Sequence, residues 1–191
     1  MAINLSANLK KIAVVGVGNV LFTDEGIGVY AAKYLEENYT FSDNVDIIDG
    51  GVLGFRLMPF FQDYDYVLLL DTVSIEDEAG SIYKLPKEAM LGLGSYRKTA
   101  HEVEIVEMLE ICTFLDKCAE VTVVGIIPLD IETVECNLTP SILNNYNAYI
   151  KTILDELTLI GASFSKQESY QPIKTVVSDF FEENNKARIH A

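Results

Sequence analysis

Three residues of the sequence have side chains that could together bind a divalent metal ion: Glu25, Asp71 and His101. Two carboxylates and a neutral imidazole form a mixed ligand set that suits Zn²⁺, Ni²⁺ or a similar ion with a coordination position left open. Each residue also has an ordinary structural role available, because acids near helix starts and strand ends commonly cap turns. The metal hypothesis therefore depends on whether the fold brings the three residues together.

Glu25 and Asp71 each follow or end a predicted strand. An apolar, β-branched run over 11–17 predicts the first strand, and Glu25 opens the helix predicted over 25–39. Asp71 ends a second apolar run over 66–71. Because ligands of open parallel sheets bind beyond the carboxyl ends of the strands, both acids should reach the same edge.

His101 lies at the start of a helix predicted over 102–115. Thr99 and Glu102 have the spacing of a capping box, which places His101 in the first turn. The helix dipole disfavours imidazolium there and keeps the ring in the neutral form that binds metals. The two-histidine zinc helix is excluded, because Ile105 stands where its second histidine belongs.

The rest of the chain continues the alternation of strands and helices. Further strands are predicted over 45–49, 81–85 and 121–127, the second of them at a sheet edge, and further helices over 53–61 and 139–159. Continuous apolar strands alternating with helices indicate an α/β fold, with a mostly parallel sheet covered by helices on both faces. The length of 191 residues indicates a single domain.

The residue composition of the chain changes after Gly161. We expect an α/β domain over 1–160, followed by a tail over 161–191 that mixes polar residues with a short apolar patch. The tail is either flexible or docked through that patch, which consists of Val176, Val177, Phe180 and Phe181.

Charge and cysteine content narrow the function classes. The net charge of -15 repels phosphate backbones and anionic lipid headgroups, which argues against nucleic-acid and membrane-surface binding. No apolar run approaches the ~20 residues of a membrane span, and the N-terminal residues lack the pattern of a secretory signal. The three cysteines form no CxxC pair. We therefore expect a cytoplasmic protein without a disulfide framework.

Other catalytic arrangements find less support. The sequence has no G-x-S-x-G elbow, and only His101 could serve a serine or cysteine nucleophile. Gly16-Val17-Gly18 begins like a dinucleotide fingerprint, but Leu21 replaces its third glycine, and the following acids would repel phosphates. A nucleotide-binding module thus stays an alternative of lower rank.

Several short segments occur in a characteristic order along the chain. They are the long run 16–28, Asp49-Gly50-Gly51, Leu69-Leu70-Asp71, His101, Gly125-Ile126-Ile127-Pro128 and Leu138-Thr139-Pro140. This ordered set resembles the hydrogenase maturation endopeptidases, which remove a C-terminal peptide from the large-subunit precursor of [NiFe] hydrogenase after nickel insertion. The resemblance extends from about Lys11 to Leu159 and implies a twisted central sheet between helices.

The resemblance also implies roles for individual residues. The family's metal-contacting positions fall on Glu25, Asp71 and His101, which the spacing had already selected. Asp49, Gly50 and Gly51 match a turn that either serves only the backbone or faces the substrate.

The mechanism expected from this resemblance uses nickel that the precursor carries. Glu25, Asp71 and His101 would bind that nickel, and water would attack the scissile carbonyl with a nearby carboxylate as base. Asp49 and Asp71 are the candidate catalytic residues of such an aspartyl-type endopeptidase. Whether the isolated protein holds another divalent ion is left open. The alternative is a non-enzymatic chaperone that binds nickel or the precursor.

Overall fold

The computed structural model describes residues 9–92 and 100–189, and side chains over 9–91 and 103–182. Five strands form a central sheet in the order β3 (Val45–Gly51), β1 (Ile12–Val17), β4 (Tyr66–Thr72), β6 (Glu120–Ile126) and β5 (Ile82–Pro86). The first four strands are parallel, and β5 is an antiparallel edge strand on β6. The predicted α/β class with a mostly parallel sheet is confirmed.

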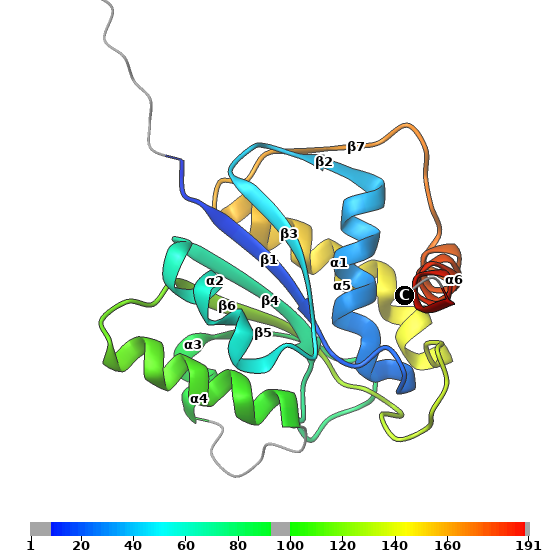
Figure 1. Ribbon diagram of the computed structural model, residues 1–191, viewed down its shortest axis with the longest axis horizontal. Coiled ribbons are helices and arrows are strands. Elements are labelled where there is room, and N and C mark those ends of the chain that lie inside the picture. The colour runs from blue at the N-terminus through cyan, green and yellow to red at the C-terminus, as the bar shows by residue number, and fades with distance from the viewer. Residues whose placement is uncertain (1–8, 93–99, 190–191) are drawn as a thin grey trace, which may run out of the picture.

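Helices cover both faces of this sheet (Figure 1). One face carries α1 (Ile27–Asn38) and α5 (Pro140–Leu159), with α6 (Ile173–Ile189) packed against α1. The other face carries α2 (Met58–Asp63), α3 (Lys87–Gly92) and α4 (Ala100–Phe114). Two 3₁₀ helices, η1 (Thr23–Gly26) and η2 (Gly54–Leu57), precede α1 and α2. None of the described helices is long and apolar enough to span a membrane.

The buried strands explain why their sequences read as continuous apolar runs. Along β4, Leu68 and Leu70 belong to the core cluster on the α1 and α5 side, whereas Val67 and Leu69 belong to the cluster on the α2 and α4 side. Because successive side chains of a strand point to opposite faces, a sheet covered on both faces needs apolar residues at every position.

Two glycines allow α1 to lie unusually close to the sheet. A Cβ atom on Gly28 would be 2.1 Å from the Leu70 carbonyl oxygen, and one on Gly16 would be 2.2 Å from the Gly28 carbonyl oxygen. Any larger residue would force the helix outward. The close packing of α1 on β1 and β4 thus accounts for both glycines without a bound nucleotide.

The described part of the C-terminal tail is docked on the domain. Its strand β7 (Phe164–Lys166) pairs antiparallel with β2 (Tyr39–Phe41), and α6 buries Val176 and Val177 against the α1 side of the core. Of the two alternatives for this segment, the structure therefore shows docking. The division of the chain at residue 160 stays a prediction.

A buried asparagine tethers the segment that leads into α6. Asn38 accepts a hydrogen bond from the Gln171 backbone amide at 2.8 Å and donates one to the Gln171 backbone carbonyl at 3.1 Å.

The sequence analysis did not predict β2, β7, α3 or α6. The two strands have only three residues each, so they show too few residues for a periodic pattern.

Candidate active site

The strand order places the candidate residues at the carboxyl edge of the sheet. Strand β1 lies between β3 and β4, and the chain leaves it first toward β3 and later toward β4. Such a reversal of strand order opens a crevice beyond the carboxyl ends of the strands. Asp49 lies near the end of β3, Glu25 lies in η1 after β1, and Asp71 lies near the end of β4.

Gly18 fixes the position of Glu25. Its φ of +129° suits glycine, and a Cβ atom there would be only 1.8 Å from the Glu25 carbonyl oxygen. The Gly18 amide also donates to the Gly51 carbonyl at 3.0 Å, which ties the loop after β1 to the end of β3. Glu25 lies in η1, and η1 packs against β4, the strand that carries Asp71.

Asp24 anchors η1 from the other side and was not selected by the sequence analysis. Its carboxylate is completely buried. One oxygen accepts hydrogen bonds from the amides of Leu129 and Asp130 at 2.9 and 3.2 Å, and from the Thr139 hydroxyl at 2.8 Å. The other oxygen accepts from the Thr139 amide at 2.7 Å. These four bonds hold η1 to the segment 127–139.

Thr23 beside it adopts a strained backbone conformation. Its φ of 36° is rare for a β-branched residue. The strain is held by hydrogen bonds from the Thr23 hydroxyl to the Thr133 carbonyl, 2.7 Å, and from its amide to the Glu135 carbonyl, 3.0 Å. Strained residues of this kind cluster at functional sites. The bonds of Thr23 and Asp24 together set the direction in which the chain presents Glu25.

Asp71 is buried at the end of β4. Only 3% of its surface is exposed, and one carboxylate oxygen accepts the Thr72 amide at 2.7 Å. Tyr149 on α5 donates to the Val124 carbonyl at 2.9 Å and approaches the Asp71 carbonyl at 3.5 Å. Burial raises the pKa of the Tyr149 hydroxyl well above its ordinary value, and the nearby Asp71 charge raises it further.

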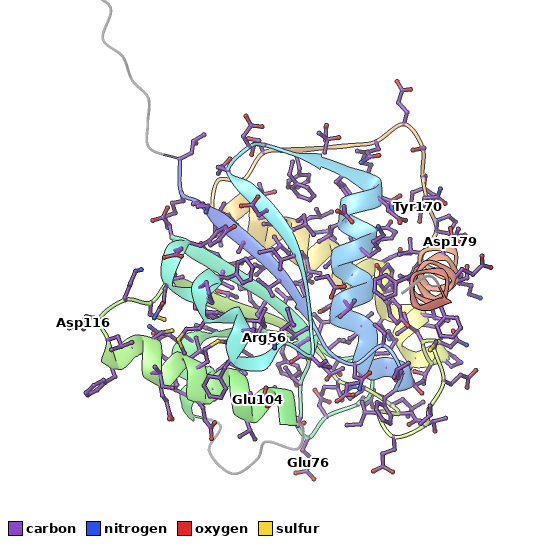
Figure 2. The ribbon with its side chains drawn as sticks, in the orientation of Figure 1. Arg56, Glu76, Glu104, Asp116, Tyr170 and Asp179 are labelled. Carbon is purple, nitrogen blue, oxygen red and sulfur yellow. The ribbon has the colours of Figure 1, made fainter. Side chains whose placement is uncertain are left out.

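The first turn of α4 lies at the same edge. The backbone of His101 belongs to this turn, but its side chain lies outside the described residues, as do Thr99 and the Glu102 side chain. A Cβ atom on Gly54 would be 1.9 Å from the Glu104 carboxylate, so α4 packs tightly on η2 (Figure 2).

The complete metal set therefore stays a prediction. Among the side chains that the structure describes, no group of three His, Cys, Asp or Glu could hold a metal ion. The predicted set includes His101, which falls outside that search. The elements of all three residues nevertheless end or begin at one edge, as the sequence analysis expected (Figure 1).

Asp49 faces the other side of the sheet from Asp71. On β3, Ile47 packs with the α1 side and Ile48 with the α4 side, so alternation places Asp49 on the α1 side. On β4, Leu70 packs on the α1 side, which places Asp71 on the α4 side. The two predicted catalytic acids thus lie on opposite sides of the strand ends, and their catalytic roles stay predictions.

Asp49 lines a pocket at the end of β3, although the residue as a whole is exposed. Burial of this carboxyl raises its pKa, and a hydrogen bond from the Gly51 amide offsets part of the rise. The more distant charge of Glu36 raises the pKa as well, and that of Lys33 lowers it.

Comparison with known sequences identifies relatives of the chain. The family model of the hydrogenase maturation protease matches residues 29–156. The hydrogenase 2 maturation protease of Escherichia coli is 30% identical over 161 residues, which cover 83% of this chain and 98% of the relative. The hydrogenase expression/formation protein HupD of Rhizobium leguminosarum is 30% identical over 155 residues, covering 80% of this chain and 77% of the relative.

Solved structures agree with these matches. The hydrogenase maturating endopeptidase HybD from Escherichia coli aligns with a TM-score of 0.77 at 30% identity, covering 82% of this chain and 98% of its own. A [NiFe] hydrogenase maturation protease from Thermococcus kodakarensis shares the fold, with a TM-score of 0.63 at 21% identity over 77% of this chain and 98% of its own. Because the family model spans more than half of the chain and the Escherichia coli proteins are covered almost end to end, this chain belongs to the hydrogenase maturation protease family.

Proposed function

We propose that the protein is the endopeptidase that removes the C-terminal peptide from the nickel-loaded large-subunit precursor of a [NiFe] hydrogenase. One observation carries this proposal. Gly18 and Asp24 hold η1 against β4, so that Glu25 and Asp71 approach one edge of the sheet. The helix that bears His101 begins at that edge.

Nickel is part of the substrate in this proposal. Glu25, Asp71 and His101 bind the ion that the precursor already holds, and two carboxylates with an imidazole suit Ni²⁺. This binding places the scissile carbonyl beside the site, so recognition and positioning are one event. Water then attacks the carbonyl, with Asp71 or Asp49 as the base of an aspartyl-type reaction.

The ion should also control the order of events. Glu25 and Asp71 bring two negative charges toward one edge, and a cation between them replaces their repulsion with attraction. The precursor without nickel should bind at least about tenfold more weakly, which equals ~1.4 kcal/mol. Cleavage should fall with it.

The test incubates the purified protein with candidate precursors, with and without nickel, and measures product masses. We expect one C-terminal peptide to be released from the nickel-loaded form. The variants Glu25→Gln, Asp71→Asn and His101→Ala should lose this release while keeping the circular dichroism spectrum. Glu132→Gln is the matched control, since this exposed acid lies on the loop 127–139 beside the site.

Each alternative result has a definite meaning. Tight binding of the nickel-loaded precursor without cleavage would identify a chaperone. Equal cleavage of the metal-free and loaded precursors would contradict nickel recognition. Normal processing by the folded His101→Ala variant would contradict the ligand assignment.

A further inference from the structure

A pocket of about 340 Å³ lies between the loop after β1, the end of β3 and α6. We call it the α6 pocket and define it by Val20, Tyr30, Asp49, Val52, Phe180 and Phe181. Gly18 also lines it, and Gly18 is in contact with the Glu25 backbone. The pocket therefore adjoins the candidate active site on its α1 side.

The wall that α6 contributes is firmly held. Val176 and Val177 are 1% and 6% exposed, which fixes one face of α6 to the core. The Phe180 ring meets the Tyr30 ring edge-on at 5.8 Å between centroids. Tyr30 in turn donates from its hydroxyl to the Val20 carbonyl at 3.2 Å, so wall and floor are connected.

This wall lies outside the part of the chain that the family model matches. The match ends at residue 156, whereas α6 begins at Ile173. The α6 pocket thus combines the loop after β1 and the Asp49-Gly50-Gly51 turn with an element beyond the matched region. Residues that select this protein's own substrate are expected where the matched part of the chain meets an element outside the match.

The chemistry of the pocket defines what it can bind. Its named side chains are aliphatic or aromatic except for the Asp49 carboxylate, which is the charged group among them. Phe181 is 42%, Val52 58% and Leu21 39% exposed, so apolar surface continues from the pocket onto the surrounding face. Apolar walls with one carboxylate fit an apolar side chain that has a cationic neighbour.

We propose that the α6 pocket is a specificity subsite that binds an apolar side chain of the precursor's C-terminal segment, with Asp49 pairing with a lysine or arginine next to it. This inference rests on the proposed function, because it takes the precursor as the ligand. The subsite orients the segment on the α1 side of the strand ends, while the metal set holds the nickel on the α4 side. Phe181 acts here as a substrate-binding residue.

The first test compares Phe181→Glu with a matched control, Phe114→Glu. Both phenylalanines are exposed, Phe181 by 42% and Phe114 by 88%, and Phe114 lies at the far end of α4. Phe181→Glu should lower kcat/KM for the nickel-loaded precursor by at least about tenfold, mainly through KM, because an apolar contact is replaced by a charge. Phe114→Glu should process at the wild-type rate.

A second readout does not depend on cleavage. A synthetic peptide with the sequence of the precursor's C-terminal segment is titrated into ¹⁵N-labelled protein. A control peptide, in which serine replaces the apolar residues, is titrated in the same way. The first peptide should shift the amide resonances of Val20, Val52 and Phe181, and the serine peptide should not. Asp49→Asn should remove the salt dependence of this binding.

The outcomes separate the subsite from the proposed function. Wild-type cleavage together with an unchanged KM for Phe181→Glu would overturn the subsite and leave the function standing. Absence of wild-type cleavage, with peptide shifts at the α6 pocket that Phe181→Glu abolishes, would support the subsite and count against the endopeptidase activity. Peptide shifts confined to other surfaces would overturn the subsite in either case.

Discussion

Two buried carboxylates lie at opposite ends of the strands, one at the carboxyl edge and one at the amino edge, and they are stabilised in different ways. Asp24 at the carboxyl edge is fully buried and accepts hydrogen bonds from three backbone amides and one threonine hydroxyl. Glu156 at the amino edge is 5% exposed. It pairs with Lys84 at 2.7 Å and accepts the Tyr66 hydroxyl at 2.8 Å.

The difference between these carboxylates concerns charge. Lys84 cancels the charge of Glu156, whereas amide and hydroxyl dipoles stabilise Asp24 without adding a positive charge. The negative charge of Asp24 thus adds to those of Glu25 and Asp71 at the same edge. The carboxyl edge thus holds a buried carboxylate that hydrogen bonds stabilise, whereas the buried carboxylate of the amino edge is part of an ion pair.

The largest effect should come from Asp24→Asn, which disrupts the hydrogen bonds that hold η1 at the carboxyl edge. Both oxygens of the Asp24 carboxylate accept hydrogen bonds from backbone N–H groups of the segment 127–139. In asparagine an NH₂ group replaces one of these oxygens, so buried N–H groups would lose their acceptor. We expect a loss of about 3 kcal/mol in the free energy of unfolding. Chemical denaturation measures this loss, and processing of the precursor should fall because Glu25 loses its support.

The matched control for this substitution is Asp130→Asn. Asp130 also accepts two backbone amides, from Glu132 and Thr133, but at the surface. A comparable loss of stability in both variants would show that burial of Asp24 is not the reason for its effect.

The next effect should come from Gly18→Ala. The added Cβ must displace the Glu25 carbonyl, and alanine disfavours the φ of +129°. Strain of this kind costs about 2 kcal/mol. Denaturation and precursor cleavage should both be affected, and a stable variant with normal cleavage would contradict the role given to Gly18.

A smaller effect should follow Glu156→Gln at the amino edge. Glutamine still accepts the Tyr66 hydroxyl but no longer neutralises Lys84, so we expect a loss of about 1 kcal/mol. Processing by the folded protein should be unchanged, because Glu156 lies at the opposite end of the strands. A lowered kcat/KM at a temperature where the variant is fully folded would show that the two edges are coupled.

The sequence predicts the carboxyl edge better than the contacts that support it. Glu25 and Asp71 are found from their positions after apolar strands, because parallel strands end at a common edge. Asp24 is not found, because its partners follow it by 105 to 115 positions and its burial depends on the path of that distant segment.

The docking of α6 shows a second limit of sequence reasoning. Val176, Val177, Phe180 and Phe181 form a short apolar patch in a polar segment, which fits either docking or disorder. Docking depends on the surface that α1 and α5 leave open, and no local pattern reports that surface. The Glu156 cluster was missed for a related reason, since Tyr66, Lys84 and Glu156 meet only through the order of the strands.

The smallest effect should come from Asp49→Asn, with a sign that depends on pH. Burial raises the pKa of the Asp49 carboxyl above its ordinary 3.8, so the folded protein holds this proton more tightly than the unfolded chain. Ionisation of Asp49 therefore lowers stability as the pH rises from that value through the raised pKa. Asparagine removes this loss, so the variant should gain stability relative to wild type between pH 4 and pH 7, as denaturation at both values would measure.

The control is Asp130→Asn, which should lose stability relative to wild type over the same pH range. Hydrogen bonds from Thr133 and Glu132 lower the pKa of Asp130, so its ionisation favours the folded state. Equal trends in the two variants would show that Asp49 is not held in a less polar environment than Asp130.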